Sequence, residues 1–141
     1  MRITKEDIRE RFEKYNDLYF GGILPRCKFH LHKTKRSSLG TYTYSSKNGK
    51  PIGEIWMAYN VEWSEETLRK VLVHEMIHHY VQVIEGKKGG IFGHNWRFKR
   101  QCKRIRKNYG VKINTCDYDI YFIGEKKPTN LFQKICRRLG F

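Results

Sequence analysis

The stretch that decides the fold is His74-Glu75-Met76-Ile77-His78, near the middle of the chain. Two histidines four residues apart project from one face of a helix, so both imidazoles can reach a single metal ion. At a zinc–nitrogen distance of about 2.0–2.1 Å the rings must converge, and a helix fixes their backbone positions for this. Glu75 lies one step round the helix, where a carboxylate can take a proton from a metal-bound water. The motif therefore predicts a zinc site with Glu75 as its general base.

The residues around this motif predict a long and largely buried helix. Ser64 can cap its start, and the run from there to Glu85 contains neither glycine nor proline. The apolar residues that surround the motif are Leu68, Val71, Leu72, Val73, Met76, Ile77, Val81 and Val83. The alternative is a chance coincidence of two histidines and a glutamate on an amphipathic helix, but burying them would be costly without a partner such as a metal ion. We therefore favour a metal site.

A third protein ligand is expected, because a catalytic zinc usually takes three and leaves its fourth position to water. His94 is the best candidate for this role. The glycines between positions 86 and 93 would allow the chain to turn back and bring His94 to the first helix. The expected cofactor is one Zn²⁺ per chain, held by His74, His78 and His94.

Other histidines and acids are weaker candidates for the third ligand. His79 points about 100° away from His78, which favours a place at the surface or behind the ligands. Glu85 lies two turns along the same helix and cannot fold back to the metal. His30 and His32 face one way on an expected strand and could bind a metal in principle, although exposed histidines on a polar face are commoner.

The remaining pattern predicts a small sheet accompanied by helices. Thr4 can cap a first helix that Gly21-Gly22 ends, and from Cys27 apolar and polar residues alternate as in a half-exposed strand. Asn48-Gly49 predicts a hairpin turn, and Pro51 suggests that the next strand has an edge or a late beginning. The expected ranges are strands at 27–32, 41–44, 52–58 and 118–123, and helices at 4–20, 64–85, 94–110 and 131–139.

Length and composition bound the class of protein. With 141 residues, 39% hydrophobic and 14% aromatic, the chain should fold as a single domain over residues 1–141. No apolar run reaches the roughly 18–20 residues of a membrane span, and the N-terminus lacks the apolar region of a signal peptide. We expect no membrane partner and a cytoplasmic location, associated with the nucleoid, or a nuclear one in a eukaryote. The cysteines, expected to be free and mostly buried thiols, are Cys27, Cys102, Cys116 and Cys136.

A strong positive charge points to a polyanionic partner. Lys and Arg number 29 against 14 Asp and Glu, and the net charge of +15 attracts polyanions such as nucleic acid or an anionic membrane, between which charge alone does not choose. Many of these cations fall on the helix after His94, where the alternative is a merely solvated helix side. The expected DNA contacts are Arg97, Arg100, Lys103, Arg104 and Lys107. Trp63 and Trp96 could stack on unpaired bases, although aromatic residues beside a helix start are more often core.

The region around the two helices resembles a known family. His74-Glu75-Met76-Ile77-His78, a glycine-containing loop and Gly93-His94-Asn95-x-x-Phe98 are similar to the SprT-like (Spartan) zinc metalloproteases. Further segments that resemble the family are Tyr15-Asn16, Tyr19-Phe20-Gly21-Gly22, Leu24-Pro25, Gly40 and the stretch 55–60. The resemblance covers about positions 4–110.

The resemblance implies an α+β fold, a minimal zincin-like metalloprotease domain with a small, mostly antiparallel sheet packed against helices. It implies that the three histidines bind zinc and that Glu75 is the catalytic base. It also implies protein substrates and a DNA partner, single strands included, with hydrolysis of peptide bonds in proteins bound or crosslinked to DNA.

Two departures from the family pattern stand out. The tail 111–141 holds only Cys116 and Cys136, too few for the four-cysteine zinc ribbon that many members carry. Asn95 replaces the usual glycine after the third histidine, and it can also begin a helix. Two other functions stay open: a zinc hydrolase of another amide or ester, and a DNA-binding protein whose zinc is structural or whose protease fold is inactive.

Overall fold

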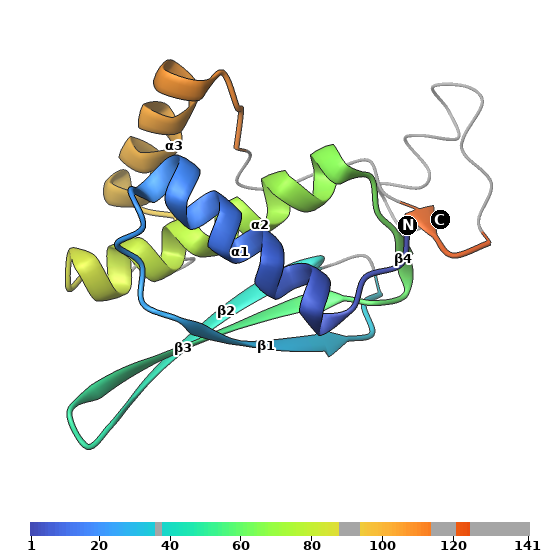
Figure 1. Ribbon diagram of the computed structural model, residues 1–141, viewed down its shortest axis with the longest axis horizontal. Coiled ribbons are helices and arrows are strands. Elements are labelled where there is room, and N and C mark those ends of the chain that lie inside the picture. Colours follow the sequence, from blue (N-terminus) through green and yellow to red (C-terminus); the bar gives the residue numbers. More distant parts are fainter. Residues whose placement is uncertain (36–37, 88–93, 114–120, 125–141) are drawn as a thin grey trace.

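The computed structural model describes residues 1–35, 38–87, 94–113 and 121–124, and these form an α+β fold. The elements in chain order are α1 (Lys5–Phe20), β1 (Cys27–His32), β2 (Gly40–Lys47), β3 (Lys50–Ala58), β4 (Val61–Glu62), α2 (Glu65–His79), the π-helix η1 (Tyr80–Ile84), α3 (Trp96–Tyr109) and β5 (Tyr121–Phe122). The helices lie on one side of the β1–β3 sheet, and the β2–β3 hairpin extends beyond the body of the molecule (Figure 1). The predicted α+β class is confirmed.

The three-stranded sheet is mixed. Its order is β1-β3-β2, with β1 parallel and β2 antiparallel to the central β3, while β4 and β5 form a separate antiparallel pair. Asn48 and Gly49 take the positive φ angles of 53° and 74° that a tight hairpin turn requires. Pro51 pairs with Ser46 on β2 and lies beyond the end of β1, whose first partner on β3 is Gly53, so it occupies a position with one neighbouring strand.

Side-chain caps set the helix starts that the sequence predicts. At α1, the Asp7 N–H donates to Thr4 Oγ1 at 3.1 Å and the Thr4 N–H donates back to Asp7 Oδ2 at 2.8 Å. At α2, the Ser64 hydroxyl accepts from the Thr67 N–H at 3.1 Å. Asn16, in the last turns of α1, donates its side-chain amide to the Leu24 carbonyl and accepts from the Leu24 N–H, both at 3.1 Å. These two bonds hold the turn between α1 and the sheet.

The helix that carries the motif changes its form at its end. A single helix was expected over 64–85, and the helical segment does continue without a break, but α2 ends at His79 and the residues that follow, Tyr80–Ile84, form the π-helix η1. π-helical turns are rare and often occur at functional sites. The predicted strand at 118–123 is described only at Tyr121–Phe122, where it pairs with β4, and the predicted helix at 131–139 lies outside the described residues.

The core lies between the helices and the sheet. Its largest fully buried members are Trp63, Phe98, Ile8, Ile55, Met57, Leu68, Leu72, Met76, Ile77 and Ile105. Cys27 and Cys102 are free thiols at the edge of this core, half-buried where deeper burial was expected, and Cys116 and Cys136 lie outside the described residues. Burial raises the pKa of Cys27 to about 12 and that of Cys102 to about 11.

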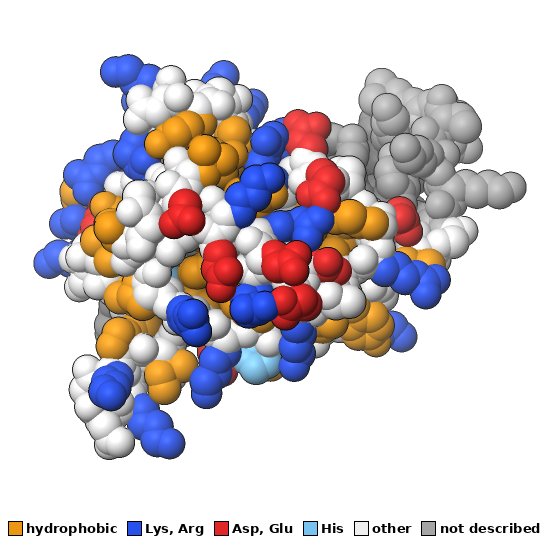
Figure 2. All heavy atoms as spheres, in the orientation of Figure 1, with side chains coloured by type: hydrophobic (Ala, Val, Ile, Leu, Met, Phe, Trp, Pro, Cys, Tyr) orange, Lys and Arg blue, Asp and Glu red, His pale blue; other side chains and the backbone are white. Residues whose placement is uncertain are grey.

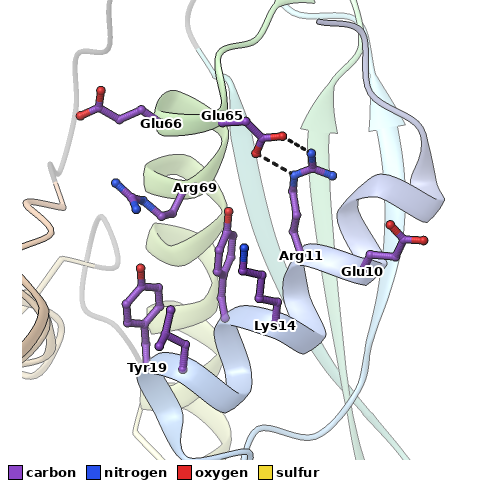
Figure 3. Close-up of a pocket in the computed structure, with 9 residues that line it drawn as sticks. Glu10, Arg11, Lys14, Tyr19, Glu65, Glu66 and Arg69 are labelled. Atoms are coloured by element: carbon purple, nitrogen blue, oxygen red, sulfur yellow. Dashed lines mark hydrogen bonds and ion pairs between the residues drawn. The ribbon is translucent and has the colours of Figure 1, made fainter.

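Helices α1 and α2 are also joined at the surface. Arg11 on α1 forms an ion pair with Glu65 in the first turn of α2 (Figure 3). The pair borders a hollow whose lining residues are Glu10, Arg11, Lys14, Tyr15, Leu18, Tyr19, Glu65, Glu66 and Arg69. None of these belongs to the predicted metal site. Among the described helices, none combines the length and apolar character needed to span a membrane.

Candidate metal centre

Three imidazoles from two separate segments meet at one point. His74 and His78 project from successive turns of α2, and His94 comes from the segment just before α3. The Nε2 atom of His74 lies 3.3 Å from that of His78 and 3.0 Å from that of His94. Four-coordinate geometry with ligands at about 2.0–2.1 Å places ligand nitrogens about 3.3 Å apart, so this spacing fits a tetrahedral metal ion. The three histidines could therefore hold one.

Burial keeps two of these imidazoles, those of His78 and His94, in the form that binds metals. Burial, and then the neighbouring His74 and His94, lower the pKa of His78 to about 3. Burial also lowers the pKa of His94, with a smaller contribution from Lys99. A metal ligand must be the neutral imidazole, so His78 and His94 are ready to coordinate at neutral pH without first losing a proton.

The phenyl ring of Phe98 packs against all three candidate ligands. Phe98, fully buried on α3, has its ring centroid 4.8 Å from that of His74, 4.5 Å from that of His78 and 4.8 Å from that of His94. It thus restricts the orientation of all three ligands. In the sequence, Phe98 stands out only within the segment that resembles the family, and its spacing of four residues from His94 was a further signal that it could lie beside the ligands.

The carboxyl group of Glu75 lies in the same buried region. Only 5% of Glu75 is exposed, and burial raises its pKa to about 8. A bound cation would act in the opposite direction and favour the carboxylate. The start of β2 passes very close to it, since a Cβ added to Gly40 would lie 3.1 Å from Glu75 Oε1 and 2.9 Å from Val71 Cγ1. Glycine is required there by space.

Comparison with known families agrees with this geometry. The model of the SprT-like family matches residues 8–117, which is most of the chain. The chain belongs to the SprT-like family. It therefore carries a metallopeptidase-type domain, and the family resemblance seen in the sequence is confirmed. No match was found among curated proteins.

In this SprT-like domain, His79 is a core residue, so of the two places expected for it, at the surface or behind the ligands, the surface is excluded. Only 1% of it is exposed. Its Nε2–H donates to the Pro25 carbonyl at 2.9 Å, which leaves Nδ1 to accept from the Tyr42 hydroxyl at 2.7 Å. The ring packs directly on Gly53 of β3, where an added Cβ would lie 2.6 Å from Nδ1. His79 therefore fastens the metal-binding helix to the sheet beneath it.

Glu85 is not near the ligands, but it joins the two segments that supply them. Its side chain is 10% exposed and accepts from Arg100 at 2.9 Å, from Gln101 at 3.3 Å and from Arg97 at 3.4 Å. These contacts tie the first turns of α3 to the end of η1. Asn95, which replaces the family's glycine, caps α3 by accepting from the N–H groups of Arg97 and Phe98. Together, the Glu85 contacts and the Asn95 cap fix the direction in which the chain leaves His94.

The five cations predicted to contact DNA have different surroundings. Arg97 and Arg100 are paired with Glu85. Arg104 donates to the Tyr19 carbonyl at 2.8 Å and lies over the Phe20 ring, so it has a structural role. Lys103 and Lys107 are exposed, and no ion pair within the described residues involves them. His30 stacks on Trp56 and bonds Glu54, and His32 bonds the Ser38 carbonyl, so neither joins the three-histidine group.

Proposed function

We propose that this chain is a zinc-dependent endopeptidase whose metal is held by His74, His78 and His94. The observation that carries the proposal is the convergence of three imidazole nitrogens on one point, with the buried Glu75 next to His74 in the chain. Zinc, when bound, would polarise the scissile carbonyl and make a bound water more acidic.

The chain's own residues would then move the protons. Glu75 would accept the proton of the attacking water and donate it to the nitrogen of the leaving amine. Phe98 would keep the imidazoles aligned and shield one side of them from solvent. β2 is an edge strand of the three-stranded sheet and passes beside Glu75 at Gly40, so an extended substrate chain could pair with it there.

We propose further that the substrates are proteins bound or crosslinked to DNA, which would place the enzyme at the nucleoid, or in the nucleus of a eukaryote. The net charge of +15 and the absence of acids from α3 support this partner. On the face drawn in Figure 2, Asp and Glu are concentrated over α1, whereas Lys and Arg predominate over α3 (Figures 1 and 2). Such segregation favours one-sided contact with a polyanion.

One assay separates this function from its rivals. Zinc-loaded wild type would be incubated with a DNA-binding protein crosslinked to an oligonucleotide, and with the same protein free. We expect faster cleavage of the crosslinked form, and loss of at least about 100-fold in rate for Glu75→Gln with zinc content unchanged. Glu66→Gln, an exposed change on the same helix, is the matched control and should cleave normally.

Each other outcome identifies a rival. Cleavage that survives Glu75→Gln would exclude the proposed role of Glu75. DNA binding without cleavage of either protein would favour a DNA-binding protein with a structural metal. Hydrolysis of small esters or amides in the absence of any proteolysis would favour a different zinc hydrolase.

A further inference from the structure

The three tryptophans of the chain have very different environments. Trp63 is buried and its indole N–H donates to the Ala58 carbonyl at 2.8 Å. Trp56 is half-buried and stacks on His30, with ring centroids 4.2 Å apart. Trp96 is 59% exposed, a larger exposed fraction than any other large hydrophobic residue in the described part of the chain has. Most of the Trp96 residue is therefore accessible to a binding partner.

Trp96 also lies next to the metal centre and is held in place. It is the first residue of α3, two positions after His94. The guanidinium carbon of Arg97 lies 4.3 Å from its ring centroid and that of Arg100 lies 5.0 Å away. Both arginines are anchored by the mostly buried Glu85. The indole and its two guanidinium groups therefore form a preorganised aromatic and cationic surface.

Cationic side chains continue from this surface along one face of α3. Trp96, Arg100, Lys103 and Lys107 recur at helical spacing on one face of α3 and span about 16 Å at 1.5 Å per residue. The helix contains no acidic residue, and basic side chains predominate over it in Figure 2. This arrangement is complementary to a nucleic acid strand. The bases of such a strand can stack on the Trp96 indole, and its phosphates attract the cations that follow along α3.

We propose that Trp96, with Arg97 and Arg100, is a stacking platform for an unpaired base, and that Lys103 and Lys107 bind the phosphates of the same strand. The proposal rests on the DNA part of the proposed function and specifies single-stranded nucleic acid. In a duplex the flat faces of the bases are already stacked on one another, so an indole can reach a free face only where the strand is unpaired. A strand bound here would bring a protein attached to it beside His94.

The test compares single-stranded and duplex DNA with the zinc-loaded full chain. Fluorescence anisotropy would measure the affinity for a labelled twelve-nucleotide oligothymidine and for a labelled hairpin duplex. We expect Trp96→Ala to weaken oligothymidine binding about 5- to 100-fold, the usual effect of losing one stacked base, and to change duplex binding less than twofold. Trp96→Phe should restore most of the loss. Tyr59→Ala removes another exposed aromatic, 47% exposed, and should change neither affinity.

Several outcomes would overturn the platform. Unchanged oligothymidine binding in Trp96→Ala, or an equal loss for both DNA forms, would show that no base stacks there. A rise in KM for cleavage of a DNA-free peptide, with DNA affinity unchanged, would assign Trp96 to protein substrate. If wild type binds neither DNA, the DNA part of the proposed function fails with the platform, whereas DNA-free proteolysis and its dependence on Glu75 would still report on the peptidase.

Discussion

At the scale of single residues, the candidate centre depends on how tightly its ligands pack against Phe98. The imidazoles of His74, His78 and His94 surround the ring of Phe98, with centroid distances of 4.5–4.8 Å. Ligand side chains bind a metal well when their orientation is fixed before the metal arrives. Phe98 provides that fixation here, although it offers no ligand atom.

Replacement of Phe98 tests this enclosure. Phe98→Ala should lower the free energy of unfolding of the metal-free protein by about 3–5 kcal/mol, because it leaves a cavity in the core. Phe98→Leu keeps most of the volume and should lose less than about 1.5 kcal/mol, yet bind zinc more weakly than wild type because the rings are less restrained. Urea unfolding in EDTA and a zinc titration would measure the two effects. A cost below about 1 kcal/mol for Phe98→Ala would contradict the packing described.

The sequence predicts the chemical groups of the centre better than their surroundings. His74, Glu75 and His78 follow from helical spacing, and His94 from the need for a third ligand and a glycine-rich turn. The burial of His79 could not be read in this way, because its partners, Pro25, Tyr42 and Gly53, come from segments far away in the chain. Long-range contacts of this kind leave no periodic signal.

At the scale of elements, two contacts place the metal-binding helix against its neighbours. One is the tie from Glu85 to α3, which connects the segment of His94 to the end of η1. The other is the close packing of His79 on Gly53, which sets the height of α2 above β3. Each can be tested by a single substitution with a matched control.

Removal of the Glu85 side chain should loosen the third ligand. Glu85→Ala is expected to lower the free energy of unfolding by about 1.5–3 kcal/mol, the usual contribution of hydrogen bonds to a charged group. It should also speed the loss of zinc to a chelator, since α3 is then less firmly held. Glu66→Ala breaks only the exposed pair with Lys70 and should cost at most about 1 kcal/mol. Equal zinc release rates in wild type and Glu85→Ala would argue against this tie.

A methyl group at Gly53 should disturb the contact between α2 and the sheet. The added Cβ would lie 2.6 Å from His79 Nδ1, closer than such atoms approach in proteins, and would be tightly packed at 3.1 Å from Cys27 Sγ. We expect Gly53→Ala to cost about 1–3 kcal/mol of unfolding free energy, measured by thermal or urea unfolding. Ser46→Ala, an exposed change on the neighbouring β2, serves as the control. A Gly53→Ala protein as stable as wild type would rule out the close approach.

The helices were easier to predict than the sheet. Local caps at Thr4, Ser64 and Asn95 define where the helices begin, and such signals lie within a few residues of one another. The parallel pairing of β1 with β3 was not foreseen, because it joins strands separated by the whole of β2. The π-helical end of α2 also leaves no signature in the residue pattern of Tyr80–Ile84.

At the scale of the whole molecule, charge is unevenly distributed. The basic α3 lies beside the metal centre, while α1 and the start of α2 carry many of the acids (Figure 2). Contacts between Lys or Arg and phosphates release counterions, so DNA affinity through such a surface must fall as salt rises. Lys103 and Lys107 are exposed cations on α3, so the salt dependence of DNA binding can be tested at these two residues.

Neutralising these lysines should reduce the salt dependence of DNA binding. For Lys103→Gln with Lys107→Gln, the slope of log K against log salt should become shallower by about 1–2, because each lost phosphate contact contributes roughly 0.7–0.9. Lys14→Gln lies on the acidic α1 face and should leave the slope unchanged. DNA affinity that does not decline with salt, or a double variant with the wild-type slope, would exclude this surface.

The central claim is that His74, His78 and His94 bind one zinc ion and leave a coordination position open. X-ray absorption at the zinc edge, on protein purified without added metal and quantified for metal content, tests it most directly. The expected result is about one zinc per chain with nitrogen and oxygen neighbours at about 2.0–2.1 Å, three of them imidazoles. The His94→Ala variant, purified in the same way, should have lost the bound zinc. No bound zinc, or a sulfur neighbour near about 2.3 Å from a cysteine, would contradict the claim.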